Sequence, residues 1–203
     1  MEQIIHYIKE RYAPLSIILY GSYAEGTNDQ NSDFDALVIS KQTKIVHDTS
    51  VVDGVILDVF VYPQTWFDED CDPDMFVQIF DGRVLMDTDG IGEKLRSGAA
   101  RYVQEIPKKT DEQIRSDIAW CEKMFERVKR CDAEGAFRWH WVLTDSLEIF
   151  CGIRRHPYLG PKKSLKWMER THPQAYTYYQ NALLDFRLDA LAAWITYLKT
   201  IAL

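Results

Sequence analysis

The chain has 203 residues, of which 46% are hydrophobic and 27% are charged, a composition typical of globular proteins that excludes a disordered chain. This length allows one large domain or two small ones, each able to bury a core. The net charge of −7, with no broad basic tract and no apolar stretch of about 20 residues, argues against a stable nucleic-acid partner and against a membrane partner.

Apolar runs in the first 90 residues predict a short helix followed by several strands. The dipeptide Asp53-Gly54 separates two of these strands and is a strong hairpin signal, because the turn needs positive φ angles. The expected elements are a helix over residues 2–12, strands over residues 15–20, 34–39, 44–52, 55–62 and 83–86, and short helical segments over residues 65–67 and 73–80.

From about Gly90 onward, apolar residues recur at three- and four-residue spacing, which predicts helices. We expect Thr110 and Ser164 to be N-cap residues and Pro173 to open a further helix. The expected helices cover residues 91–106, 111–129, 134–155, 164–171 and 188–201, with one more that begins at 173.

A mixed half is thus followed by a helical half, with a boundary near Pro107. We predict an α+β fold, in which a small mixed β-sheet with flanking helices spans residues 1–107 and a helical bundle spans residues 108–203. The first half carries 8 Lys and Arg against 19 Asp and Glu, a net charge of −11, whereas the second carries 16 against 12, a net charge of +4. The acidic half suits metal ions or a cationic substrate, and the mildly basic half could face phosphates.

The cellular location is expected to be the cytoplasm, because the N-terminus lacks the cationic and then apolar pattern of an export signal. The four cysteines form no Cys-x-x-Cys pair, so we expect reduced thiols and no zinc site. The oligomeric state does not follow from the sequence, and a homodimer is left open.

The stretch GSYAEGTNDQNSDFDALV joins a glycine-flanked loop to two carboxylates. Gly21 lets the backbone approach a ligand closely, and Ser22 adds a hydroxyl and an N–H at the start of a short turn, which suits a phosphate. Asp33 and Asp35 lie on one face of the next strand, where like charges favour protonation of one carboxyl unless a cation neutralises them. Mg²⁺ takes carboxylates together with phosphate oxygens, and Asp58 in a later apolar strand is placed to supply a third acid.

The same stretch resembles the Gly-Ser-x10-Asp-x-Asp motif of the DNA polymerase β-type nucleotidyltransferase superfamily, and Asp58 resembles its third carboxylate. The resemblance covers residues 15–62 and implies three acids that hold two Mg²⁺ ions beside a nucleoside triphosphate such as ATP. It further implies transfer of a nucleoside monophosphate to an acceptor hydroxyl, with release of pyrophosphate. Gly21 and Ser22 would hold the terminal phosphates, and the two strand aspartates would ligate both metals. Asp58 would bind the metal nearer the acceptor and could also take the acceptor proton.

A compact catalytic domain followed by a helical bundle is similar to the small bacterial antibiotic nucleotidyltransferases that act on aminoglycosides or lincosamides. It is also similar to minimal nucleotidyltransferases that act as antitoxins. We therefore expect a small hydroxylated acceptor, such as an aminoglycoside-like antibiotic, and a role in antibiotic resistance. Two alternatives stay open: transfer of AMP to a protein side chain, and a nucleotide-binding pseudoenzyme, which the three intact acids disfavour.

The helical half contributes three further candidates. Some of the antibiotic enzymes that the chain resembles draw a glutamate base from their helical domain, and Glu148 lies with Asp145 in the apolar stretch DSLEIFCG. Lys162 and Lys163, near a helix start, are candidates for contacts to the triphosphate. The alternatives are a solvated helix face for Glu148 and an exposed basic loop for the two lysines.

Three other features receive expectations of their own. The acidic run over residues 68–74 could attract a polycationic acceptor or form a solvated loop. The aromatic cluster at 137–150 is expected to pack in the core rather than to stack on a ligand. No metal-ligand spacing appears among the histidines, for which we expect structural or surface roles: His6, His47, His140, His156 and His172.

Overall fold

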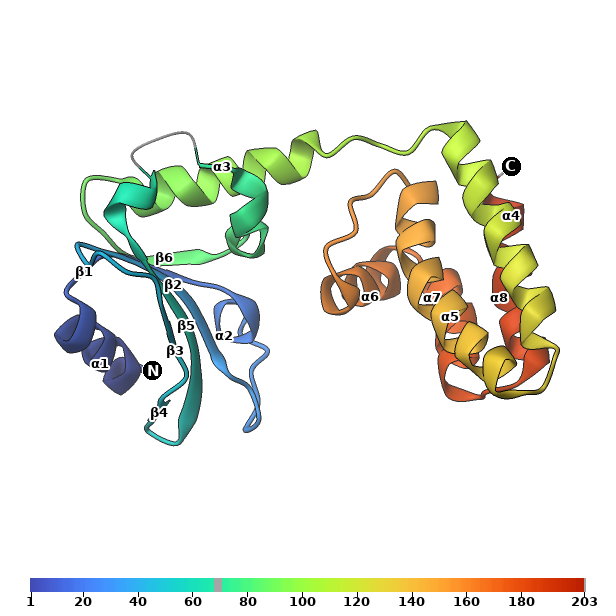
Figure 1. Cartoon of the computed structure of the whole chain (residues 1–203), viewed down its shortest axis with the longest axis horizontal. Coiled ribbons are helices and arrows are strands. Elements are labelled where there is room, and N and C mark those ends of the chain that lie inside the picture. The colour runs from blue at the N-terminus through green and yellow to red at the C-terminus, as the bar shows by residue number, and fades with distance from the viewer. Residues whose placement is uncertain (68–70, 203) are drawn as a thin grey trace. The chain divides into compact units, whose positions relative to one another are not determined.

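The computed structural model describes residues 1–67 and 71–202 (Figure 1). The chain divides into two compact units, Met1–Ile106 and Pro107–Leu203. The first unit has apolar clusters on both sides of a β-sheet, and the second has one cluster between its helices. Each unit therefore has a core of its own, and the mixed α/β architecture with C-terminal helices confirms the expected fold class.

A six-stranded mixed sheet forms the centre of the first unit. Its order is β3-β5-β2-β1-β6, and β4 pairs with β5. β2 and β5 are parallel neighbours, whereas β1 is antiparallel to both β2 and β6. The strands are β1 (Pro14–Leu19), β2 (Phe34–Ser40), β3 (Val46–Asp48), β4 (Val51–Val52), β5 (Val55–Pro63) and β6 (Arg83–Asp87).

Helices cover both faces of this sheet. α1 (Glu2–Tyr12) shares an apolar cluster with the even-numbered residues of β2, whereas α3 (Ile91–Glu105) and the 3-10 helix η2 (Pro73–Ile79) share one with its odd-numbered residues. A second short 3-10 helix, η1 (Gln64–Phe67), directly follows β5. Because β2 is buried from both sides, its sequence is continuously apolar from Ala36 to Ile39 instead of alternating.

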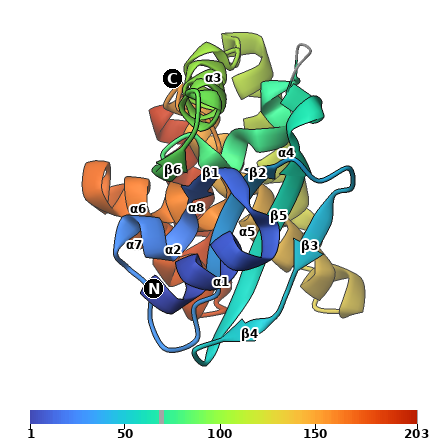
Figure 2. The same cartoon turned by 90° about the vertical axis from the view of Figure 1, so that its left-hand side faces the viewer.

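The strand expected over residues 44–52 is divided into β3 and β4. The strand is interrupted between them, where the Ser50 N–H donates to Asp48 Oδ1 at 2.9 Å, a side-chain bond that competes with regular strand pairing. The Leu57 N–H still donates to the Ser50 carbonyl at 2.9 Å across the break. β3 and β4 therefore keep one common register along β5, beside which both run in Figure 2.

The expected hairpin turn between β4 and β5 is confirmed. Asp53 and Gly54 have φ angles of 54° and 77°, and Val52 pairs with Val55 directly across the turn. Two successive positive φ angles are the requirement of a type I′ turn, which Asp-Gly satisfies with little strain. The turn sets which residues of β3 face which residues of β5.

The described residues of the second unit form five helices, and no helix in the described part of the chain is long and apolar enough to cross a membrane. Thr110 caps the first of them in a capping box with Gln113, as the sequence predicts. The expected core packing of the aromatic cluster is only half right, because Trp139 and Phe150 are buried but Phe137 is 63% and Trp141 38% exposed. The helices are α4 (Asp111–Val128), α5 (Ala133–Ile153), α6 (Pro161–Thr171), α7 (Pro173–Leu184) and α8 (Leu188–Ile201).

The expected cap at Ser164 is wrong. α6 begins three residues earlier, at Pro161, and the Ser164 N–H donates to the Gly160 carbonyl inside the first turn. Proline suits the first helical position because its φ angle is already helical and no N–H is needed there. Ser164 is consequently a buried helical residue and not a cap.

Asp48 attaches α1 to the hairpin. Its carboxylate is 5% exposed and accepts hydrogen bonds from the Tyr12 hydroxyl at 2.6 Å and the Tyr7 hydroxyl at 3.2 Å. Burial alone would raise the pKa of Asp48, but the hydrogen bonds from Ser50, Tyr12 and Tyr7 outweigh it and hold the pKa below its ordinary value of 3.8. The ionised form is therefore the one that the fold stabilises.

We expect Asp48→Asn to lower the free energy of unfolding of the first unit by about 1–3 kcal/mol at neutral pH, because an amide accepts these bonds less well. Since the folded-state pKa is depressed, the contribution is present above pH 3.8 and is lost as the pH falls further. Urea unfolding and hydrogen exchange of α1 peptides at several pH values measure the difference between the variant and the wild type. A difference that stays constant down to acid pH would contradict the assignment.

Candidate functional site

The carboxylate of Asp35 lies directly against Gly21. Gly21 has a φ angle of +64°, and a β-carbon built on it would lie 2.2 Å from Asp35 Oδ2, well inside contact distance. The Tyr20 N–H donates to the Asp35 carbonyl at 3.1 Å, which ties the end of β1 to the start of β2. Gly21 and the Asp35 carboxylate are therefore in direct contact at one end of the sheet.

The segment after Gly21, expected as a short turn, is the one-turn helix α2 (Gly21–Glu25). Gly26 ends it in the left-handed conformation, where its N–H donates to the Ser22 carbonyl. Ser22 is 5% exposed and sits in the first turn beside Gly21. Gly21 thus lies against Asp35 and Ser22 follows it in α2, while the contact of both residues to a phosphate stays a prediction.

Asp58 lies beside Asp35 on the neighbouring strand. β2 and β5 are parallel, and Asp35 pairs in register with Asp58, so that both side chains leave the same face of the sheet. Burial raises the pKa of the Tyr20 phenol, and the negative charges of Asp58 and Asp35 raise it further, because the ring lies near both. Asp33 is exposed and precedes Asp35 by two residues, immediately before β2 begins.

His47 is a neighbour of the carboxylates that residue spacing did not single out. Its Nε2 lies 2.6 Å from Asp58 Oδ1, and its ring stacks on Phe60 with the ring centres 4.1 Å apart. The signal that could have found it is the Asp53-Gly54 turn. A two-residue turn pairs position 47 with position 60, which puts His47 on the same face as Asp58 and diagonal to it.

The oxygen atoms of this site suit a hard divalent cation. Carboxylates are the side-chain ligands that Mg²⁺ takes in proteins, and Asp35 and Asp58 supply two of them from adjacent strands. In the part of the chain that the structure describes, no group of three or more His, Cys, Asp or Glu residues is arranged to hold a metal ion. The fit therefore rests on this pair, and the set of three acids with two ions stays a prediction.

The candidates of the helical unit are all on helices. Glu148 is exposed on α5, and its charge adds to burial in raising the pKa of Tyr158. Lys162 is exposed and Lys163 is half-buried in the first turn of α6, so they do not form the basic loop given as their alternative. Their roles in the reaction stay predictions.

Part of the acidic run falls outside the described residues, which exclude 68–70. Within the described part, Asp72 accepts a hydrogen bond from the Asp74 N–H at 3.0 Å and caps η2. At least this carboxylate has a local structural role. Attraction of a polycationic acceptor by the run stays a prediction.

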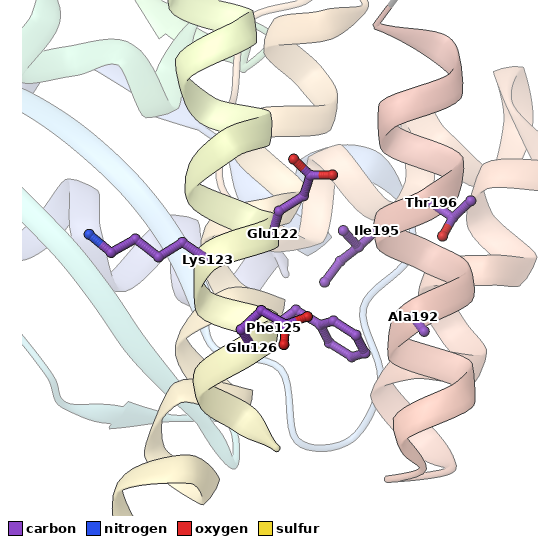
Figure 3. A pocket seen from close by; sticks show the side chains of 7 residues that line it. All are labelled: Glu122, Lys123, Phe125, Glu126, Ala192, Ile195 and Thr196. Atoms are coloured by element: carbon purple, nitrogen blue, oxygen red, sulfur yellow. The ribbon is translucent and has the colours of Figure 1, made fainter. Parts of the chain in front are cut away.

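Two surface pockets lie away from the candidate residues. One, of about 490 Å³, lies next to η1 and α3 and is lined by Phe67, Ile91 and Leu95 among others. The other, of about 310 Å³, lies between α4 and α8, where the Phe125 ring points toward α8 while Lys123 points away (Figure 3). Neither is lined by Asp35, Asp58, Glu148, Lys162 or Lys163.

Comparison with known proteins supports the interpretation of the motif as that of a nucleotidyltransferase. The model of a family described as a nucleotidyltransferase domain matches residues 1–134. Among solved structures, a nucleotidyltransferase-like protein from Exiguobacterium sibiricum 255-15 is similar over 99% of this chain and 73% of its own, with 12% identity and a TM-score of 0.43. A likeness at that level does not bear on function. The comparison with curated proteins returns no match.

We expect Gly21→Ala to abolish the binding of metal and nucleotide, because its β-carbon would displace the Asp35 carboxylate. Gly26→Ala is the matched control. Gly26 also has a positive φ angle, of +70°, but a β-carbon there meets nothing within 4 Å. Both variants lose about 1–2 kcal/mol of stability from backbone strain. Calorimetric titration with Mg²⁺ and each nucleoside triphosphate separates the two, and equal binding by both variants would contradict the placement of Asp35.

Proposed function

The chain belongs to the nucleotidyltransferase domain family, whose enzymes transfer a nucleoside monophosphate from a nucleoside triphosphate, and we propose that this enzyme uses Mg²⁺ and transfers the group to a hydroxyl of a small acceptor. The observation that carries the proposal is the position of Asp35. It lies against Gly21 of the loop and in register with Asp58 of the next strand. A phosphate-binding loop and paired carboxylates at one site are what metal-assisted phosphoryl chemistry requires.

Each residue of the site has a role in this proposal. The Ser22 hydroxyl and the N–H groups of the loop bind the terminal phosphates. Asp33, Asp35 and Asp58 would hold the magnesium ions; the strand register supports this for Asp35 and Asp58, and carboxylate chemistry supports it for all three. Magnesium held there would lower the pKa of the acceptor hydroxyl and offset charge on the departing pyrophosphate. The protein then contributes mainly by positioning the reactants.

The acceptor in this proposal is a cationic hydroxylated molecule such as an aminoglycoside. The support is the net charge of −11 over residues 1–107, which attracts polycations through its long-range field.

Glu148 is proposed as the base that takes the acceptor proton, and Lys162 and Lys163 as contacts to the triphosphate. Glu148→Gln should slow transfer without changing nucleotide affinity, and transfer at the wild-type rate would remove Glu148 from the mechanism.

Asp35→Asn tests the metal assignment directly. We expect the wild type to be stabilised by one nucleoside triphosphate only when Mg²⁺ is present, by about 2.7 kcal/mol at a hundredfold excess over the dissociation constant. The variant should lose this stabilisation and nearly all turnover, because it removes a charged ligand. Thermal unfolding with ATP, GTP, CTP and UTP, each with and without Mg²⁺, measures the effect.

The control for this experiment is Asp53→Asn, which removes the same charge from an exposed turn where asparagine is equally well tolerated. It should retain the wild-type response. If Asp35→Asn is stabilised by magnesium and nucleotide as strongly as Asp53→Asn is, the metal assignment is wrong. With the donor known, a screen of aminoglycosides, other hydroxylated molecules and proteins then identifies the acceptor class.

Ser22→Ala tests the loop. Loss of a hydrogen bond to a charged phosphate costs about 1.5–3 kcal/mol, so affinity for the triphosphate should fall by about tenfold or more. Ser97→Ala on α3 removes a hydroxyl that bonds Glu93 instead and should leave the affinity unchanged. Calorimetry of triphosphate binding makes the comparison, and equal affinities in the two variants would count against the phosphate-binding role of Ser22.

A further inference from the structure

His47 contacts the site from the edge of the sheet. β3, on which it lies, is the outermost strand on that side, and β5 separates it from β2. The imidazole Nε2 is 2.6 Å from Asp58 Oδ1. With its proton on Nε2, the ring donates to that oxygen and leaves Oδ2 of Asp58 for another partner.

A second contact holds the imidazole in place. The His47 ring lies parallel to the Phe60 ring, with an angle of 5° between the planes and 4.1 Å between the centres. Phe60 is its direct cross-strand partner, so the backbone register places both rings together. The plane of the imidazole is thus supported by a contact other than the one with Asp58.

The contact between His47 and Asp58 does little for folding. The side chains are 46% and 39% exposed, and pairs in such a position contribute little to stability. Yet a carboxylate that binds a metal is itself commonly held by a hydrogen bond, and loss of that outer partner weakens metal binding. The geometry is therefore better suited to orienting the Asp58 carboxylate than to stabilising the fold.

We propose that His47 is a positioning residue for Asp58, holding Oδ1 so that the carboxylate is oriented for the metal ion shared with Asp35 and the nucleotide. The inference rests on the proposed function, since it presupposes that Asp58 binds a metal. It assigns His47 no contact with substrate and no proton transfer. Its consequence is that affinity for the metal depends on a hydrogen-bond donor at position 47.

Three variants test this inference by metal binding rather than by turnover. His47→Leu removes the donor, whereas His47→Gln retains an amide N–H at a similar reach to Nε2. His6→Leu makes the same change at an exposed position of α1. Binding of Mn²⁺ is followed by the loss of the free-ion spin-resonance signal, in the presence of non-hydrolysable α,β-methylene analogues of ATP, GTP, CTP and UTP.

We expect His47→Leu to weaken Mn²⁺ binding by about 10- to 100-fold. His47→Gln should stay near the wild type, and His6→Leu should equal it. Wild-type affinity in His47→Leu overturns the inference, and so does an equal loss in the leucine and glutamine variants, because the donor would then not be what matters. If the wild type itself binds no Mn²⁺ with any analogue, both the proposed function and this inference are wrong.

Discussion

The carboxylate of Asp35 occupies the space that a β-carbon at position 21 would need. This contact joins the loop after β1 to the first residues of β2, and β2 is buried from both sides between α1 and the η2–α3 layer. The position of the loop relative to the carboxylates is therefore set by the core of the first unit. A site built in this way on rigid strands needs little ordering when its ligand binds.

The parallel pairing of β2 with β5 places a second carboxylate, that of Asp58, beside Asp35. Carboxylates that leave the same face of adjacent strands repel one another, and the fold tolerates this at Asp35 and Asp58 because both are only partly buried. A neighbouring imidazole and a cation are two ways of reducing that repulsion.

Much of the first unit could be predicted from the sequence, because its signals are local. The apolar runs, the Asp53-Gly54 turn and the two-residue spacing of Asp33 and Asp35 each depend on neighbours in the chain. The start of α6 was misplaced because Pro161 and Ser164 are both helix-start signals, and proline at the first position prevailed. The break at Ser50 depends on the hydrogen bond that the Ser50 N–H donates to the Asp48 side chain, which apolar periodicity does not reveal.

The pairing of His47 with Asp58 was missed for a different reason. It is a diagonal contact between strands, so it appears only when the register of the hairpin is combined with the direction of each side chain. The acceptor could not be predicted from the sequence, because its identity depends on the residues that contact it in the folded protein. An apolar helical pattern such as that of α5 does not indicate which residues those are.

The length of the turn at Asp53-Gly54 is more tightly constrained than that of most surface loops. Most surface loops accept an added or deleted residue. Here a change of one residue would slide β3 past β5 by one position, and because strand side chains alternate, the imidazole would face the opposite side of the sheet. The ten residues between positions 47 and 58 are therefore a fixed spacing in any redesigned version of this hairpin, although none of the turn residues contacts the site.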